Sequence, residues 1–558
     1  MKQQVLFFFF TLMLTGISVS AQTGGGRIAG VVIDNAGEEP LPGATIFIEE
    51  LKKGIVTDGH GEFLLSDVPA ATYTLTVRFI GYHTQTRKLT VGKERGKKII
   101  IRLKAEAKSL DEVVVMGKSE ARKLREQAMP ISVISMNQIQ GTVNNVQDIL
   151  AKTAGITVRA TGGTGSTSRI SVRGLEGKRI GLFIDGNPMN DNSDFIDIND
   201  IPVEMIDRIE IYKGVVPAKF GGSAVGGAVN IVIKEYPPKY LDVNYSYGSF
   251  NTHNASVVSK MNIAPKGIEF GLGGFYTYAD NDYKMKSPFQ EGLTITRDHD
   301  KFKKTVIGGS FKARKWWFDL VEFEPVFIHT YKDIQGIESN IRHAHSHSNA
   351  FIFANKMEKE NFLLDGLDLD WQLGYIYTDY HFADTASHRT HWDGTHYPAV
   401  SEFGGEIGKW ASLLTNEKHQ LQHKLNLNYL VNENHSVNFN SLLKYAHANP
   451  RDGMKDKVIG YRTDFPSNMF SWVAGLNYDY RTSNDKFLNS FNVKYYYYSM
   501  KTRMASVLVK TAEDIDTHKN DFGISNALRY RITPSLMAKA SFGYDVRLPS
   551  EEELLGDG

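Results

Sequence analysis

The fold of this 558-residue chain is decided by the stretch from Asp148 to Lys234. It contains, in order, DILAKTAGITV (148–158), RISVRG (169–174), FIDG (183–186), IEIYKG (209–214) and FGGSAVGGAVNIVIK (220–234). One short helical pattern is followed by extended runs rich in Ile and Val, and glycines separate these runs. The stretch therefore predicts an α+β domain. Its glycines allow the backbone to pass close to surrounding structure.

Two polar patterns inside this region invite comparison with known binding sites. The loop TGGTGSTS (161–168) is rich in glycine, but it lacks the Gly-Lys-Ser/Thr ending of a phosphate-binding loop. We therefore expect a mobile loop. Asp191, Asp194, Asp197 and Asp200 fall on every third residue, whereas an EF-hand calcium loop uses alternate positions. Solvated turns and helix caps are the preferred interpretation, and calcium binding is the alternative.

The N-terminus carries the three parts of a secretory signal. Lys2 supplies the positive charge, residues 5–14 supply the apolar core, and Val19 to Ala21 form a small-residue cleavage site. The apolar run is too short for a membrane-spanning helix. The chain has no cysteine, which excludes disulfides, thiolate metal sites and lipid attachment to an N-terminal cysteine.

Extended patterns dominate on both sides of the central stretch. Residues 27–104 contain about seven short runs broken by turn residues, which predicts a small antiparallel β-sandwich. From residue 236 onward, about fifteen runs alternate apolar and polar residues, as expected of a transmembrane β-barrel. The alternation is clear in YLDVNYSYG (240–248), KLNLNYL (424–430), FNVKYYYY (491–498) and LMAKASFGY (536–544).

The order of motifs between residues 148 and 234 resembles the plug domain of TonB-dependent outer-membrane receptors. LPGAT (41–45), TDG (57–59) and FIGY (79–82) resemble the carboxypeptidase-regulatory-like domain that often precedes such receptors in the Bacteroidetes. A TonB box is an extended peptide that adds a strand to the sheet of TonB. One run of this chain resembles such a box, and it consists of Asp111, Glu112, Val113, Val114 and Val115. A further strand of the sandwich is the alternative for this run.

The resemblance implies a mainly β protein with five parts. These are a signal peptide (1–22), a carboxypeptidase-regulatory-like β-sandwich (27–104), a TonB box and tether (108–128), an α+β plug domain (129–235) and an antiparallel transmembrane β-barrel (236–558). About fifteen strands are fewer than the twenty-two of plugged outer-membrane transporters. We therefore expect an incomplete barrel in a chain truncated at its C-terminus, with a smaller barrel as the alternative.

The resemblance also implies a function in the outer membrane of a Gram-negative bacterium. The expected activity is uptake of a scarce, bulky nutrient, most simply a ferric siderophore, haem or a related metal chelate. The implied partners are TonB with its inner-membrane energising complex, outer-membrane lipid and the small-molecule cargo. A glycan importer of the starch-utilisation type and a signalling receptor are the alternatives.

Other classes of function are disfavoured by the sequence. The net charge of +1 gives no preference for nucleic acid. Neither a His-Glu-x-x-His zinc motif nor a Gly-x-Ser-x-Gly elbow occurs, so we expect no enzyme activity, cofactor or resident metal.

Histidines gather in two segments expected to form outer loops. His343, His345 and His347 occupy alternate positions, and His391 and Trp392 follow in the second segment. Alternate residues of a strand share one face, so the three imidazoles could contact a metal or a metal chelate. We expect these five residues to contact the cargo, although histidine is also ordinary in aromatic-rich loops.

Overall fold

The computed structural model divides the chain into two compact units, Met1–Gly117 and Lys118–Gly558. It describes residues 26–35, 39–79, 82–92, 98–104, 120–136, 146–160, 162–166, 168–189, 198, 201–222, 224–263, 267–314, 316–506 and 509–549. The expected signal segment, the TonB box (111–115) and the four aspartates Asp191, Asp194, Asp197 and Asp200 lie outside these residues. Within the described residues, no helix is both long and apolar enough to cross a membrane.

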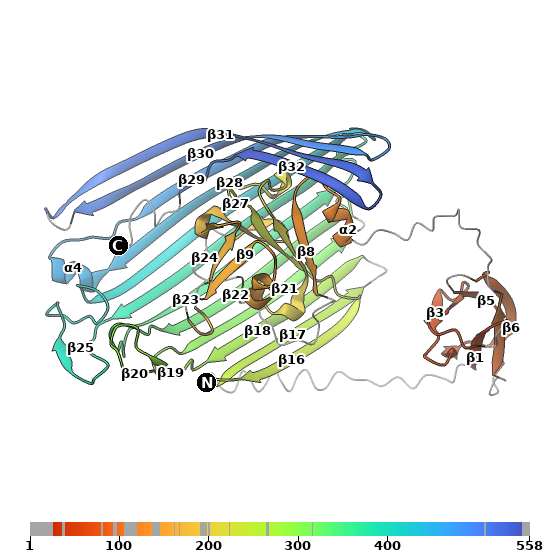
Figure 1. Ribbon diagram of the computed structural model, residues 1–558, viewed down its shortest axis with the longest axis horizontal. Coiled ribbons are helices and arrows are strands. Elements are labelled where there is room, and N and C mark those ends of the chain that lie inside the picture. The colour runs from red at the N-terminus through yellow and green to blue at the C-terminus, as the bar shows by residue number, and fades with distance from the viewer. Residues whose placement is uncertain are drawn as a thin grey trace. The chain divides into compact units, whose positions relative to one another are not determined.

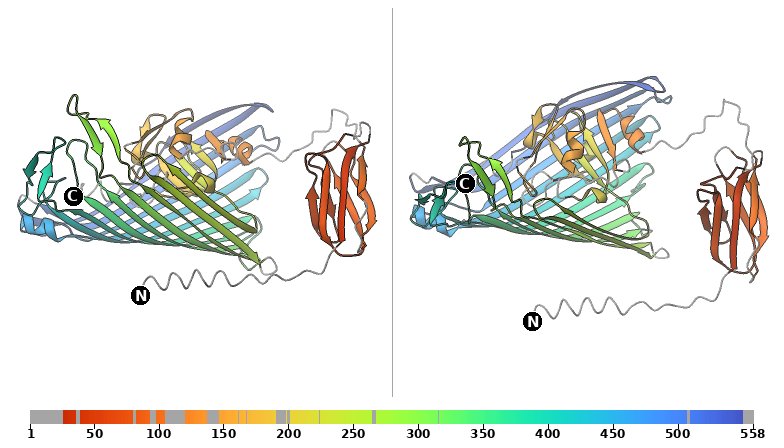
Figure 2. Two further views of the ribbon diagram at one scale, coloured as in Figure 1. Left: turned by 90° about the horizontal axis from the view of Figure 1, so that it is seen from below. Right: turned by 60° about the horizontal axis from the view of Figure 1, so that its bottom comes forward.

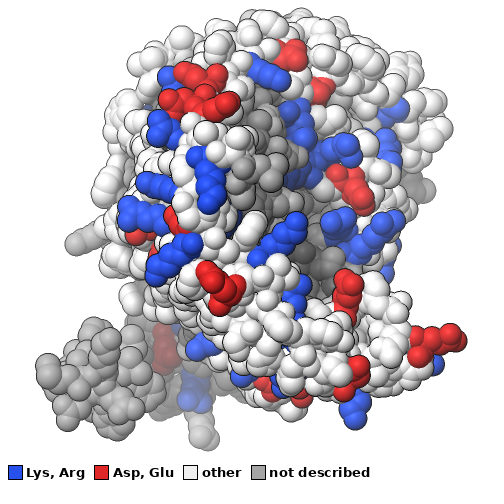
Figure 3. All heavy atoms as spheres, turned by 90° about the vertical axis from the view of Figure 1, so that its left-hand side faces the viewer, with Lys and Arg blue, Asp and Glu red and all other residues white. Residues whose placement is uncertain are grey.

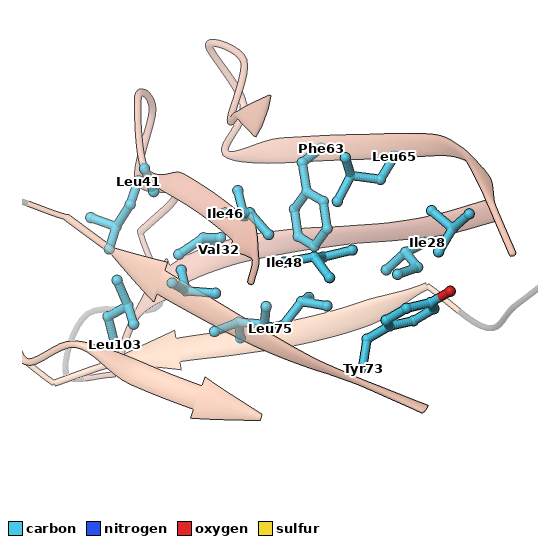
Figure 4. Packing of buried hydrophobic residues seen from close by; sticks show 14 of the residues in the cluster. Ile28, Val32, Leu41, Ile46, Ile48, Phe63, Leu65, Tyr73, Leu75 and Leu103 are labelled. Atoms are coloured by element: carbon cyan, nitrogen blue, oxygen red, sulfur yellow. The ribbon is translucent and has the colours of Figure 1, made fainter. Parts of the chain in front are cut away.

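The first unit is a sandwich of two small sheets. Its strands are β1 (Gly26–Asp34), β2 (Thr45–Ile48), β3 (Lys53–Val56), β4 (Glu62–Val68), β5 (Thr72–Arg78), β6 (Gln85–Thr90) and β7 (Ile99–Leu103). One sheet has the order β4-β1-β7 and the other β3-β2-β5-β6. Val32, Ile46 and Leu75 are fully buried between the sheets (Figure 4). The sandwich is therefore not wholly antiparallel, because β1 and β7 pair in parallel.

The N-terminal part of the second unit, residues 120–235, has the mixed structure expected of the plug. Its helices are α2 (Glu120–Arg125) and α3 (Val146–Ala151), with short 3-10 helices η2 (Gly177–Arg179), η5 (Val203–Met205) and η6 (Ala218–Phe220). Its strands are β8 (Ile131–Ser135), β9 (Ile156–Ala160), β10 (Ser168–Val172), β11 (Leu175–Glu176), β12 (Gly181–Ile184), β13 (Asn187–Pro188), β14 (Ile206–Tyr212) and β15 (Ala228–Ile233). A five-stranded sheet has the order β13-β12-β15-β14-β8. Ile209, Ile211 and Val229 of this sheet lie fully buried in the plug core.

The rest of the second unit is one antiparallel sheet of thirteen strands among the described residues. Its strands are β16 (Lys239–Gly248), β17 (Thr252–Ile263), β18 (Ile268–Ala279), β21 (Phe302–Arg314), β22 (Leu320–Asp333), β23 (His345–Lys359), β24 (Leu367–Asp384), β27 (Ser412–Asn432), β28 (His435–Asp452), β29 (Ser467–Arg481), β30 (Phe487–Ser506), β31 (Thr511–Thr533) and β32 (Leu536–Tyr544). The sheet curves around the plug, which lies on its concave side (Figures 1 and 2).

Among the described residues the sheet has thirteen strands, where about fifteen runs were expected, and two of its loops carry short hairpins outside it. β19 (Tyr283–Lys286) pairs with β20 (Thr294–Arg297), and β25 (His388–Thr390) pairs with β26 (His396–Pro398), outside the thirteen-stranded sheet. A helix, α4 (Gly453–Ile459), lies in a third connection. All three connections leave the same end of the sheet, which we call the loop end. The opposite end, which carries connections as short as residues 433–434, is called the turn end.

The predicted alternation of faces is confirmed. Leu241, Val243, Tyr245 and Tyr247 are 63–70% exposed on the outer, convex face of β16. On β27 the even-numbered residues Lys424 and Asn426 point inward and contact the plug. A sheet with an apolar outer face and a polar inner face matches the pattern of an outer-membrane barrel.

Candidate functional site

The candidate site is the interior of the second unit, where the plug meets the inner face of the sheet. A buried carboxylate organises the plug side. Glu210 lies on β14, directly opposite Asn230 of β15, and both residues are 3% exposed. The Glu210 carboxylate accepts hydrogen bonds from Arg208 Nε (2.8 Å), the Tyr212 hydroxyl (2.9 Å) and Asn230 Nδ2 (3.0 Å). Asn230 Oδ1 accepts the backbone N–H of Gly186 (2.9 Å), which extends the network to the turn after β12.

Electrostatics fix the protonation states in this network. Burial and the negative charge of Glu210 raise the pKa of Tyr212 far above its usual value, so its hydroxyl stays a donor. Burial alone would lower the pKa of Arg208, but Glu210 and Asp207 outweigh burial and raise it. Three donors thus surround the Glu210 carboxylate, which is the arrangement that stabilises a buried carboxylate.

The start of the plug is bound to the turn end of the sheet. Glu126, just after α2, accepts a hydrogen bond from Arg531 of β31 (2.9 Å). Arg531 also contacts Asp485 in the turn between β29 and β30 (2.8 Å). Lys539 of β32 donates to the backbone carbonyl of Met129 (3.0 Å). The first described residues of the plug are thus fixed by charged side chains from neighbouring parts of the sheet.

The glycine-rich loop of the plug is bound near the loop end, so the expectation of a mobile loop does not hold for its described residues 162–166. The side chain of Asn281, 2% exposed, accepts from the Thr164 N–H (3.0 Å) and donates to the Thr164 carbonyl (2.9 Å). Lys332 of β22 donates to the Gly165 carbonyl (2.9 Å). Gly165 has φ of 78°, and a Cβ atom there would overlap the ring of Phe302. Glycine is required at this contact by both conformation and space.

The middle of the plug is bound to β27 and β28. Lys424 Nζ donates to the Gly186 carbonyl (2.7 Å), and Asn426 Nδ2 donates to the Lys219 carbonyl (3.1 Å). A Cβ atom on Gly221 would lie 3.2 Å from Leu442 Cβ, so the plug backbone closely approaches β28. The contact with Leu442 explains the glycine at position 221.

Two outer connections at the loop end are joined through buried carboxylates. Glu406, 4% exposed, accepts the backbone N–H groups of Arg342 (3.0 Å), His343 (2.6 Å) and Ala344 (2.7 Å). Asp384 at the end of β24 accepts the Glu406 N–H (2.6 Å). Residues 334–344 and 385–411 therefore form one structured layer, which we call the joined loops.

The structure separates the five residues expected to contact cargo into two groups. His343, His391 and Trp392 lie in the joined loops. The Trp392 indole N–H donates to the Ile337 carbonyl (2.8 Å), and the His391 ring packs against Tyr397 with 4.4 Å between ring centroids. His343 precedes β23, so the three alternate histidines do not lie on one strand.

His345 and His347 lie on β23, but on its outer face. They share the parity of Phe351 and Phe353, which are 41% and 43% exposed on the convex side. His347 stacks on His381 of β24, with 4.4 Å between ring centroids and 8° between ring planes. Both imidazoles therefore lie on the convex face, because neighbouring apolar residues set the phase of the strand, and their contact with cargo stays a prediction.

Sequence reasoning missed the buried polar residues that hold the plug, the sheet and the joined loops in place. Lys424, Asn281, Glu406 and Glu210 are buried polar residues, and only the last left a readable signal: a carboxylate inside the apolar run IEIY. No group of three or more His, Asp or Glu side chains suited to a metal ion occurs in the described part of the chain. Viewed from the loop end, many Lys and Arg side chains are exposed on this face, together with Asp and Glu side chains (Figure 3).

Comparison with known proteins matches this architecture. The CarboxypepD_reg-like domain family matches residues 28–115, and the TonB-dependent Receptor Plug Domain family matches residues 123–228. TonB-dependent receptor P39 of Formosa agariphila is 28% identical over 249 residues, which cover 43% of this chain and 23% of that protein. The vitamin B12 transporter BtuB of Vibrio vulnificus is 24% identical over 265 residues, which cover 46% of this chain and 43% of that protein.

A solved structure shares the fold. The siderophore receptor PiuA from Acinetobacter baumannii superposes with a TM-score of 0.53 at 15% identity, over 75% of this chain and 64% of that chain. The matched region spans less than half the length of either relative, P39 or BtuB. This chain carries a CarboxypepD_reg-like domain and a TonB-dependent receptor plug domain, and TonB-dependent receptors are its homologues.

Proposed function

We propose that this protein is a TonB-dependent transporter of the outer membrane that takes up a bulky metal chelate. The observation that carries the proposal is a plug bound by side chains of the surrounding sheet at its start, its glycine-rich loop and its middle. Such a plug closes the interior at rest and must be moved before cargo can pass. The outer membrane has no ATP supply of its own, so force has to come from a partner.

The attachment point for that force is proposed at the TonB box, Asp111 to Val115. This run precedes α2 in the chain, and Glu126 follows α2 directly. Tension on the chain before α2 would therefore reach the Glu126–Arg531 pair before it reaches the Glu210 network. We propose domain limits that follow the same order along the chain: a tether at 108–128, a plug at 129–235 and a barrel from 236.

The proposed cargo is a ferric siderophore, haem or cobalamin-like chelate. His343, His391 and Trp392 present imidazole and indole groups in the joined loops, and imidazole is a common ligand of iron, cobalt and copper. Basic side chains exposed at the loop end suit the anionic groups of many chelates (Figure 3). Siderophore and vitamin B12 are also the ligands named for PiuA and BtuB.

Uptake by cells that express the gene from its own locus tests the proposal. A proline at Val114 removes a backbone donor that strand addition needs, whereas isoleucine at the same position keeps it. We expect Val114→Pro to abolish energised uptake of radiolabelled ferric siderophores, haem or cyanocobalamin, and Val114→Ile to leave it unchanged. Equal uptake by the two variants would refute TonB-dependent transport through this segment.

Cargo contact is tested with matched histidine pairs. The double variant His343→Ala/His391→Ala should weaken binding of the transported chelate, whereas His345→Ala/His347→Ala on the outer face should not. Equilibrium binding to the purified protein is the measurement. If only the His345→Ala/His347→Ala variant bound the chelate more weakly, the cargo site would not lie in the joined loops.

A further inference from the structure

The hairpin of β25 and β26 carries two histidines on one of its faces. His396 of β26 lies directly opposite Thr390 of β25. Residues two apart on a strand share a face, so His388 lies on the same face as Thr390 and His396. The ring centroids of His388 and His396 are 4.5 Å apart, and their ring planes are at 90° to each other. The pair therefore connects the two strands of the hairpin.

The other face of the hairpin carries His391, which is proposed above to contact cargo. Tyr397 lies opposite Arg389 on this face, and its ring packs against the ring of His391. The Arg389 guanidinium donates to the carbonyl of Gly408 farther along the same connection. The pair of His388 and His396 is thus separate from the proposed cargo contact of His391.

Each ring of the pair has its Nδ1 atom beside a hydroxyl group. His388 Nδ1 lies 3.0 Å from Ser387 Oγ, and His396 Nδ1 lies 3.1 Å from Thr390 Oγ1. In the described part of the chain, neither Nε2 atom has a hydrogen-bond partner. A hydroxyl oxygen that accepts from Nδ1–H fixes the tautomer whose Nε2 has a free lone pair, which is the form that binds metal. His388 is half-buried and His396 is exposed, so an ion in solution can reach both.

A second pair of histidines shows why the ring planes matter. The rings of His347 and His381 are as close, with 4.4 Å between centroids, but their planes differ by only 8°. A nitrogen lone pair lies in the plane of its ring, so two parallel rings cannot both point at one ion. His381 Nε2 is also held by Asp379 Oδ1 (2.9 Å). Perpendicular planes intersect, so one ion can lie in the planes of His388 and His396 together.

We propose that His388 and His396 bind one divalent transition-metal ion, Zn²⁺, Ni²⁺ or Cu²⁺, through their Nε2 atoms. Imidazole suits these ions, whereas Ca²⁺ and Mg²⁺ prefer oxygen ligands. Two nitrogens that each lie about 2.0–2.1 Å from one ion are about 3 Å apart, which the two rings reach by turning about their side-chain bonds. Water completes the coordination, since the described residues supply no group of three or more His, Asp or Glu side chains suited to a metal.

The bound ion joins two strands that are short. β25 and β26 have three residues each, and a two-stranded hairpin is marginally stable by itself. A bridge from His388 to His396 encloses the turn at residues 391–395, which contains His391 and Trp392. The ion therefore orders this turn. The inference goes beyond the proposed transport function and does not depend on it.

Equilibrium dialysis of the purified full chain against the chloride salts of Zn²⁺, Ni²⁺ and Cu²⁺ tests the site. The chain has no cysteine, so no thiol competes for these ions. We expect His388→Ala and His396→Ala each to weaken binding of one ion by at least about tenfold. His347→Ala is the matched control, because it removes one ring of the parallel pair, and it should bind the ions as the unaltered protein does.

Hydrogen exchange of residues 388–398 is the second measurement. Zn²⁺ should slow this exchange in the unaltered protein and in His347→Ala, but not in His388→Ala. His388→Gln repeats the comparison with a polar side chain that disturbs the hairpin less. Equal metal affinity in the unaltered protein, His388→Ala and His388→Gln would overturn the proposal. An equal loss of affinity in His347→Ala would also overturn it, because binding would then not depend on the perpendicular pair.

Discussion

The Glu210 network permits a quantitative prediction about the plug. Glu210→Ala removes the acceptor of Tyr212 and Asn230, which are 2% and 3% exposed. A buried donor without a partner costs about 1–3 kcal/mol, so the two together cost about 4 kcal/mol. Arg208 adds little because it keeps Asp207 (2.9 Å) and is partly exposed. The sum agrees with about 3–5 kcal/mol for breaking a buried ion pair.

Hydrogen exchange of peptides from β14 and β15 is the assay, since it reports the opening free energy of the plug separately from that of the sheet. A loss of about 4 kcal/mol corresponds to roughly thousandfold faster exchange in Glu210→Ala. Glu204→Ala, an exposed carboxylate in η5, is the matched control and should change exchange by less than about 0.5 kcal/mol. Similar exchange in Glu210→Ala and in the control would refute the energetic role assigned to the network.

Three further predictions concern the contacts around the plug. Lys424→Met should lower the opening free energy of the β12–β13 segment by about 1.5–3 kcal/mol, the range for a hydrogen bond from a charged donor, measured by hydrogen exchange. Gly165→Ala should destabilise the glycine-rich loop more than Gly292→Ala, because both have φ of 78° but only the first meets the Phe302 ring; thermal unfolding compares them. Glu406→Gln should speed proteolysis of the joined loops at neutral pH, because three N–H groups lose a charged acceptor.

Much of the fold could be predicted from the sequence because burial and alternation are linked. An apolar outer face and a polar inner face require period two, so the runs 240–248 and 491–498 identified both strands and faces. The alternation of residues does not show which strands pair with each other. The parallel contact of β1 with β7 joins strands separated by most of the first unit, and alternation is the same whichever way a neighbour runs.

The phase of β23 could also have been read from the sequence. Positions 345, 347, 351 and 353 carry His, His, Phe and Phe, and the two phenylalanines identify the outer face of the strand. Sequence reasoning treated the histidines as a local cluster and did not extend their parity to the apolar residues. The contact between the joined loops could not be predicted from the sequence, because Glu406 binds backbone groups 62–64 residues away.

Lys312 and Lys424 follow the same polar-in pattern of the sheet, yet they have different partners for a reason visible in the register. Lys312 lies opposite Glu322, so its charge is neutralised within the sheet. Lys424 lies opposite Gln372 on one side and Leu442 on the other, and neither is a carboxylate. Its ammonium group therefore takes a plug carbonyl as acceptor. A cross-strand carboxylate thus pairs with Lys312 within the sheet, whereas Lys424 has no such neighbour and binds the plug.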